Sequence, residues 1–337
     1  RAQAELPLGV VDTQPNGDAP PSPTDSLAKI SVPDGFRVTL FAGEPDVHQP
    51  IDMTFDDRGR LWVVENFSYP DWQAKDSDRI LIFDDKDNDG QFDSRIVFAE
   101  NLSNITGIAL GFDGVWACST PHLILIPDRD QDDKPDGPAV IKLDGWNDTS
   151  DDIEHNVFNG LVWGPDGWMY GGHGILANSL VGKPGTPASE RLRLNCGIWR
   201  YHPVTEKFEV VAHGTTNPWG IDFDDLGQCF FTNSVIGHLW HLIPGARYER
   251  MYGTHFNPHA YALIDQCADH YHWGGGKWTE SRGGKGIHNE AGGGHAHVGA
   301  MIFRGGTWPD KYHGSLFTAN LHGNRINRDT IQRQGSG

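Results

Sequence analysis

The sequence predicts an all-β chain, and more specifically a β-propeller. Gly and Pro are frequent, with 42 Gly and 21 Pro in 337 residues, which argues against a helix bundle. Short apolar runs are separated by Gly, Asp, Asn and Pro, a texture typical of many short strands. One hairpin pattern also returns along the chain, and a repeated hairpin unit is typical of propeller blades.

Each copy of this pattern has an apolar run, a tight Asp/Gly turn and a second run with alternating aromatic residues, which predicts a β-hairpin. The copies start 54, 53, 59 and 80 residues apart and span residues 51–66, 105–120, 158–173, 217–233 and, more faintly, 297–320. A tandem of β-sandwiches is the alternative, but it would not be expected to repeat one hairpin five times. We expect six blades, of which five are recognisable and the last is truncated or completed by an N-terminal strand.

Residues 1–28 are rich in Pro, Ala, Ser and Asp and predict an extended arm or linker, whereas residues 29–337 form the propeller. The first strand is expected at residues 35–42. The four Cys have no C-x-x-C spacing, and their even number leaves disulfide pairing open.

Charge and hydropathy exclude some partners. The formal net charge is −18, with no basic run, so nucleic-acid binding is not expected. No apolar stretch is long enough to span a membrane. The first residues show neither Met nor a signal peptide, which suits a processed product, and we expect a periplasmic or extracellular location.

Two acidic loops follow apolar runs and predict calcium sites. Oxygen ligands at alternating positions, turned sharply by a Gly, suit a hard cation such as Ca²⁺. The alternative is a solvated acidic turn, since Asp, Asn and Gly favour turns for their own reasons. Position 6 is Gly90 in the first loop and Asp133 in the second. Positions 1, 3, 5 and 9 are Asp85, Asp87, Asp89 and Asp93 in the first loop, and Asp128, Asp130, Asp132 and Asp136 in the second.

Polar residues recur where the first strand of a blade begins. Inner strands and their preceding loops line the channel of a propeller, so such side chains are expected to converge. His155 follows Glu154 at the entry to one blade, and an imidazole there can take a proton from an alcohol. The corresponding residues of later blades are Asn217, His295, His297 and Arg325.

Two H-x-H pairs, His270 with His272 and His295 with His297, have the spacing of metal ligands on one face of a strand. They predict a transition-metal site if both strands face one cavity. The alternative is simple lining of the channel.

On these motifs the chain resembles the quinoprotein glucose and sorbosone dehydrogenases over roughly residues 32–337. It resembles more closely the propeller domain of planctomycete-type proteins described as membrane-bound dehydrogenases. EHNVFNGLVWGPDG matches the family motif of the catalytic base, which implies that role for His155. TNPWG matches RNPxG, so Asn217 corresponds to the cofactor-side Asn, and Thr216 stands where the family has an Arg.

The resemblance further implies pyrroloquinoline quinone (PQQ) as cofactor. His295 or His297 falls near the family Lys that holds PQQ, and LHGNRINR retains Arg325 and Arg328 in the region of the quinone-binding arginines. Relatives of this type often continue into a c-type haem domain. Since no C-x-x-C-H occurs in this sequence, a haem acceptor would lie outside the chain.

The leading hypothesis is therefore a calcium-stabilised dehydrogenase that oxidises a hydroxyl of a sugar or polyol, with His155 as base. A second hypothesis is a metal-dependent lyase or hydrolase that uses the His270, His272, His295 and His297 cluster. A third is a non-catalytic propeller that binds a glycan or a partner domain.

Overall fold

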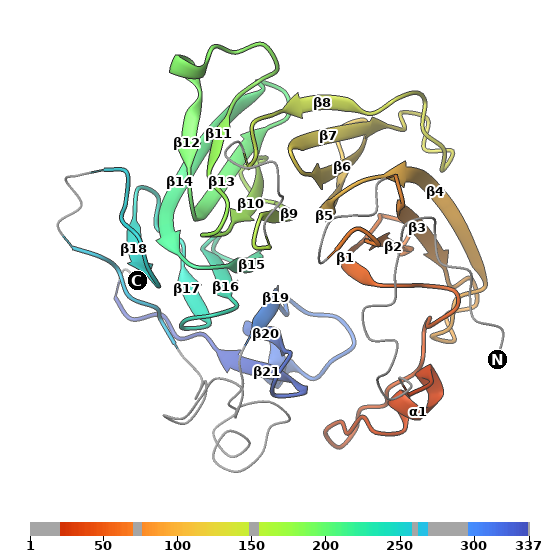
Figure 1. Cartoon of the computed structure of the whole chain (residues 1–337). Coiled ribbons are helices and arrows are strands. Elements are labelled where there is room, and N and C mark those ends of the chain that lie inside the picture. Colours follow the sequence, from red (N-terminus) through yellow and green to blue (C-terminus); the bar gives the residue numbers. More distant parts are fainter. Residues whose placement is uncertain (1–20, 70–75, 148–154, 258–261, 269–295, 336–337) are drawn as a thin grey trace, which may run out of the picture. The chain divides into compact units, whose positions relative to one another are not determined.

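The computed structural model describes residues 21–69, 76–147, 155–257, 262–268 and 296–335. The fold is all-β, a β-propeller built of small antiparallel sheets (Figure 1). Contacts divide the chain into two compact units, Arg1–Ile141 and Lys142–Gly337. No helix in the described ranges is long and apolar enough to cross a membrane.

The first unit contains two blades of four antiparallel strands each, in the sheet orders β1-β2-β3-β4 and β5-β6-β7-β8. One short helix, α1 (Pro23–Leu27), precedes them, and β8 ends two residues beyond the division. The strands are β1 (Pro50–Phe55), β2 (Leu61–Glu65), β3 (Asp78–Asp84), β4 (Ser94–Leu102), β5 (Ile105–Gly111), β6 (Gly114–Ser119), β7 (His122–Pro127) and β8 (Val140–Leu143).

The second unit contains three blades. In the first of them β18 pairs in parallel with β14, giving the order β18-β14-β13-β10-β9, and β11 and β12 form a separate ribbon. The strands of this part are β9 (Phe158–Trp163), β10 (Met169–His173), β11 (Ser179–Val181), β12 (Leu192–Leu194), β13 (Gly197–His202), β14 (Lys207–Thr215) and β18 (Arg247–Arg250), with a 3-10 turn, η1, at Ala188–Glu190.

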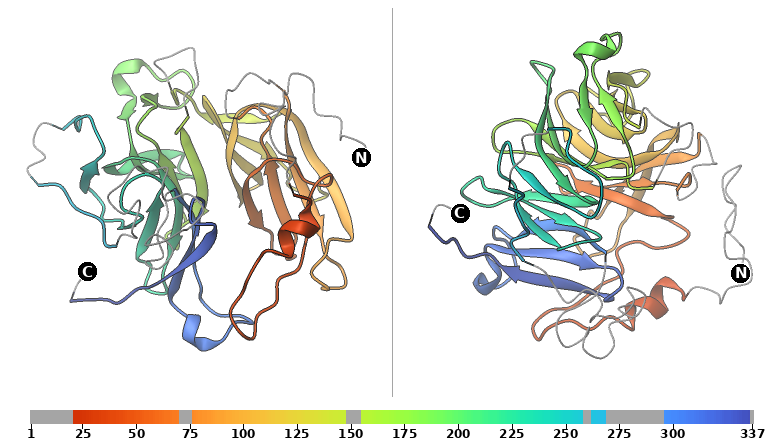
Figure 2. Two further views of the ribbon diagram at one scale, coloured as in Figure 1. Left: turned by 60° about the horizontal axis from the view of Figure 1, so that its bottom comes forward. Right: turned by 60° about the vertical axis from the view of Figure 1, so that its left-hand side comes forward.

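The other two blades of this unit have three strands each. They are β15 (Pro218–Phe223), β16 (Cys229–Asn233) and β17 (Leu239–His241), then β19 (His297–Ile302), β20 (Ser315–Asn320) and β21 (Arg325–Thr330), with the 3-10 turn η3 at Asp310–Tyr312. The first strands are neighbours, because β15 contacts both β9 and β19. Both views in Figure 2 show the β19–β21 sheet beside the β15–β17 sheet.

One backbone hydrogen bond recurs in four blades and closes the same end of each hairpin. The residue after the second strand donates its N–H to the carbonyl of the residue before the first strand. The pairs are Asn66 to Gln49 at 3.2 Å, Thr120 to Asn104 at 3.3 Å, Ser234 to Asn217 at 3.0 Å and Leu321 to Ala296 at 3.1 Å. Repetition of this bond shows that the blades are copies of one unit.

The five repeated hairpins are confirmed, since each corresponds to the first two strands of a blade. The described residues form five blade sheets, and no sixth is present among them. A sixth blade therefore stays a prediction.

One local prediction is wrong. Residues 35–42 form no strand; Phe41 packs by its side chain against Phe83 and Phe92, and its carbonyl accepts a single long bond from the Phe92 N–H at 3.4 Å. The arm or linker expected at residues 1–28 stays a prediction; its described part, from residue 21, carries the helical turn α1, because Ser22 caps the Asp25 N–H and a Pro occupies the first turn.

Apolar side chains between adjacent blades form the core. In the first unit Trp62, Ile82 and Phe98 pack with Ile108 and Ile124 across the two sheets. Such burial is the main favourable contribution to folding.

Partly buried carboxylates also tie blades together within each unit. Asp52 Oδ2 accepts the Ile108 N–H at 2.9 Å, and Asp222 Oδ2 accepts the Ile302 N–H at 2.6 Å. The four cysteines all lie in the described ranges and are free.

Candidate functional site

The beginnings of β9, β15 and β19 bring three of the predicted residues into neighbouring blades of the second unit. His155 lies in the loop before β9, Asn217 directly before β15, and His297 is the first residue of β19. Because β15 contacts both other strands, these positions lie at the same end of adjacent inner strands (Figure 1).

Asn217 is held by its backbone, which leaves its side chain for other contacts. Its N–H donates to Asn233 Oδ1 at 2.6 Å, and its carbonyl accepts the Ser234 N–H at 3.0 Å. Its side chain is 8% exposed, and within the described residues its Oδ1 has no hydrogen-bond partner. The same holds for Oγ1 of Thr216. Buried acceptors of this kind gain free energy when a ligand supplies a donor or a cation.

His297 is fully buried and belongs to a polar cluster that the sequence did not reveal. Its carbonyl accepts the Ser234 hydroxyl at 3.2 Å, and its ring centroid lies 4.8 Å from that of His238. Nε2 of His238 lies 3.0 Å from Oδ2 of Asp329. His238 lies between β16 and β17, outside the five repeated hairpins. Only the tertiary structure therefore brings it to this cluster.

Arg325 and Arg328 point to opposite faces of β21, because side chains of a strand alternate. Arg325 pairs across the sheet with Asn320, which pairs with His297. Asp329 lies on the same face of β21 as Arg325, and Asp329 is the residue that contacts His238. Arg328 instead donates to Ser315 Oγ at 2.9 Å, and its guanidinium lies over the ring of Tyr312.

His155 is exposed, whereas His173 at the end of β10 is fully buried. His173 Nδ1 lies 2.8 Å from the Gly174 carbonyl and its Nε2 lies 2.7 Å from Ser179 Oγ. Burial lowers the pKa of His173 to about 4, so this ring is neutral at pH 7. Of the two, only His155 has access to a substrate from solvent.

The transition-metal cluster can be described only in part. His270, His272 and His295 lie outside the described residues. In the part of the chain that the structure describes, the groups of three or more potential metal ligands contain only aspartates.

Those aspartates are the two predicted calcium loops. In each loop the carboxylates at positions 1, 3 and 5 bring one oxygen each within 4.8 Å of the others. The groups are Asp85, Asp87 and Asp89, and Asp128, Asp130 and Asp132.

The two loops share one hydrogen-bond pattern. The position 5 N–H donates to the position 1 carboxylate at 3.2 Å in both. The position 2 N–H donates to the position 9 carboxylate, Asp93 at 2.7 Å or Asp136 at 2.9 Å. The pKa of Asp128 is raised, first by burial and further by the charges of Asp132 and Asp130. A cation would relieve this repulsion, and the oxygen donors are those that Ca²⁺ prefers.

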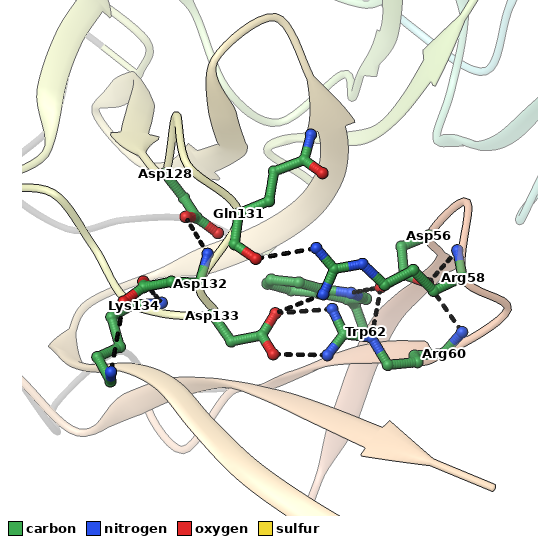
Figure 3. A network of polar contacts seen from close by, with 9 residues as sticks. All are labelled: Asp56, Arg58, Arg60, Trp62, Asp128, Gln131, Asp132, Asp133 and Lys134. Carbon is green, nitrogen blue, oxygen red and sulfur yellow. Dashed lines mark hydrogen bonds and ion pairs between the residues drawn. The ribbon is translucent and has the colours of Figure 1, made fainter. Parts of the chain in front are cut away.

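Position 6 is where the loops differ. Gly90 has a φ of +89°, and Asp133 adopts a similar left-handed conformation with a φ of +68°. Figure 3 shows that the Asp133 side chain turns away from the loop and meets Arg60. Arg60 Nη1 and Nη2 donate to the two carboxylate oxygens at 2.6 and 2.7 Å, and Arg60 Nε donates to Asp56 at 2.8 Å. Asp133 is therefore a structural residue and not one of the loop ligands.

Residues 22–337 match the family model described as a domain of unknown function, DUF7133. The chain belongs to the DUF7133 family. No curated protein matches the sequence of this DUF7133 chain.

Solved structures share the fold of the DUF7133 chain. PQQ-bound aldose sugar dehydrogenase from Streptomyces coelicolor is 17% identical, with a TM-score of 0.55 over 85% of this chain and 78% of that one. The PQQ domain of pyranose dehydrogenase from Coprinopsis cinerea, in its holo form, is 14% identical, with a TM-score of 0.51 over 88% and 77%. Virginiamycin B lyase from Staphylococcus aureus matches less well, with 11% identity and a TM-score of 0.42 over 87% and 85%.

Proposed function

We propose that the DUF7133 chain is an oxidoreductase of the PQQ-dependent sugar dehydrogenase type, acting on a hydroxyl of a sugar or polyol. One observation carries the proposal. At one end of neighbouring inner strands, His155 and Asn217 lie beside the cross-strand row formed by His297, Asn320 and Arg325. The fold likeness to two PQQ-bound sugar dehydrogenases supports it.

His155 is the general base in this proposal. Its imidazole is exposed, so a substrate hydroxyl can approach it from solvent. A neutral imidazole accepts the hydroxyl proton while the carbon gives up a hydride. The buried, neutral His173 is left as a structural residue.

PQQ would supply the electrophilic quinone that accepts the hydride. The residues present fit it through two features. Asn217 offers a buried amide whose Oδ1 has no hydrogen-bond partner in the described chain, and Arg325 offers a half-buried guanidinium for a carboxylate. Because Arg328 is bound to residues of its own blade, we leave it out of the cofactor site.

Calcium binding by the two acidic loops belongs to the same proposal. The matching geometry of the loops supports it, as do the clustered carboxylates and the raised pKa of Asp128. The ions would be structural, since they would bind at turns between strands. An exported location and an external c-type haem acceptor are the remaining parts of the proposal. Cell fractionation and reduction of added cytochrome c test them.

The decisive experiment is titration of the purified chain with PQQ and Ca²⁺, followed by dye reduction over a panel of aldoses and polyols. We expect saturable PQQ absorbance, turnover of at least one sugar and loss of turnover in His155→Gln at unchanged PQQ binding. His313→Gln is the matched control, because that side chain is 49% exposed and its ion pair within the described residues is with Asp225 at 3.5 Å. Absence of both PQQ binding and dye reduction would refute the proposal.

A further inference from the structure

A fully buried carboxylate, Glu65, joins two side chains at the end of β2 in the first unit. Its side chain is 0% exposed. Oε1 accepts the backbone N–H of His48 at 2.7 Å, and Oε2 accepts Nε of Arg79 at 2.7 Å. Arg79 lies directly opposite Glu65 in the β2–β3 register. A buried charge is costly unless it is paired and hydrogen-bonded, and these contacts satisfy that need for Glu65.

The ring of His48 faces the same carboxylate. Its Nδ1 is buried, makes no hydrogen bond within the described residues and lies 3.5 Å from Glu65 Oε1, so the influence of the carboxylate on it is electrostatic. A carboxylate beside Nδ1 favours the tautomer with the proton on that nitrogen, which leaves Nε2 as an acceptor. The His48 side chain is 14% exposed, and the hydrogen bonds of the described chain include none to its Nε2. Since Nδ1 is the buried edge, the exposed edge is the one that carries Nε2.

Arg79 completes a donor and acceptor pair. Its side chain is 26% exposed, and its Nε and Nη2 are both directed to Glu65 Oε2. Its guanidinium lies 5.0 Å from the Phe67 ring, and the His48 ring lies 6.0 Å from the same ring. One buried carboxylate and one aromatic ring therefore fix both side chains, while each keeps a polar edge toward solvent.

His48 also has the blade position of His155. Gln49, which follows His48, is left-handed with a φ of +40°, and Asn156, which follows His155, is left-handed with a φ of +75°. His48 lies two residues before β1, and His155 lies three residues before β9. A structural ion pair between Glu65 and Arg79 needs no imidazole, so the presence of His48 at this position calls for another role.

We infer that His48 and Arg79 form a binding site for a vicinal diol of a sugar or polyol. His48 Nε2 accepts one hydroxyl proton in a hydrogen bond, and Arg79 donates to the neighbouring oxygen. Glu65 is a positioning residue that sets the tautomer of His48. The ligand class rests on the proposed function, whereas the site itself rests on the contacts of these three residues.

The test is NMR of the full chain with ¹⁵N-labelled histidine and added D-sorbitol. We expect a pyridine-type shift for His48 Nε2, assigned by its loss in His48→Gln, and a saturable change of that signal on addition of sorbitol. 1,3-Propanediol, whose hydroxyls are not vicinal, should leave the signal in place. Glu65→Gln should mix the two tautomers and weaken sorbitol binding about tenfold, as expected for loss of a charged orienting group. His313→Gln should behave as wild type.

Two results would overturn the inference. One is a pyrrole-type Nε2 at His48, and the other is an unchanged His48 signal at saturating sorbitol. If Glu65→Gln does not fold, Arg79→Lys serves instead, with the same tenfold weakening expected and with unchanged binding counting against the site. Because the readout is binding and not turnover, failure of the dehydrogenase proposal would not mimic failure here.

Discussion

Substitution of Asp133 separates the energy of an ion pair from the energy of a strained backbone. The Asp133 carboxylate makes two short bonds to Arg60, and the two side chains are only 17% and 10% exposed. The same residue has a φ of +68°. Asp133→Ala removes the pair and keeps the left-handed backbone, whereas Asp133→Gly removes the pair and relieves the backbone.

The magnitudes follow from these contacts. Hydrogen bonds to charged groups contribute about 1.5 to 3 kcal/mol, and Arg60 keeps its bond to Asp56, so we expect a loss of about 2 kcal/mol for the pair. A left-handed non-Gly residue costs about 1 kcal/mol or more. Asp133→Ala should therefore lower the free energy of unfolding by about 2 kcal/mol, because the strain is unchanged, and Asp133→Gly by about 1 kcal/mol, because relief of the strain offsets part of the loss.

Urea unfolding followed by Trp fluorescence at pH 7 is the assay, with Arg60→Met alone and combined with Asp133→Ala as a double-mutant cycle. The Arg60 bond lowers the pKa of Asp133, so the stabilising effect of the pair is present above about pH 4. It should disappear as the pH falls through the lower folded pKa. Equal stability of Asp133→Ala and Asp133→Gly would refute the strain argument, and a coupling energy near zero would refute the pair.

Three further predictions follow from the same kind of reasoning. Burial raises the pKa of Asp52 to about 7, so its ionisation opposes folding, and stability should fall by up to about 2 kcal/mol from pH 5 to pH 8. Urea midpoints should show a flatter pH dependence for Asp52→Asn. Added Ca²⁺ should raise the melting temperature, and less so for Asp87→Asn; no Ca²⁺ effect on wild type would make the loops ordinary turns. Gly220→Ala should cost more than about 2 kcal/mol, since its Cβ would lie 2.3 Å from the Gly299 carbonyl carbon, whereas Gly245→Ala, in open space, should cost about 1 kcal/mol.

The sequence predicted the hairpins because their causes are local. Alternating apolar residues and Gly-containing turns act within about fifteen residues, and the repeats at 51–66 and 217–233 match paired strands. Residues 35–42 have the same local pattern and form no strand. A strand needs a partner edge, and within the described residues this segment has one backbone bond to a distant part of the chain, from Phe92 N to the Phe41 carbonyl.

The candidate site was predictable only where one blade repeats another. The missing Gly at position 6 of the second acidic loop was visible in the sequence, but its compensation by Arg60 is not, since the partner lies 73 residues away. His48 had a usable signal, because it stands three residues before the first repeat just as His155 does before the third. The first repeated hairpin starts at residue 51, so His48 lies outside the repeat.

The end of the second strand carries a polar side chain in each of the five blades that the structure describes. These residues are Glu65, Ser119, His173, Asn233 and Asn320, and all but Ser119 are at most 2% exposed. The bond that closes the hairpins is made by main-chain atoms, so it does not itself depend on the side chain at this position. Burial of a polar group opposes folding unless the group is hydrogen-bonded. Polar residues at one position of five blades therefore serve to position neighbouring groups, as Asn233 does for the Asn217 backbone and Glu65 for His48 and Arg79.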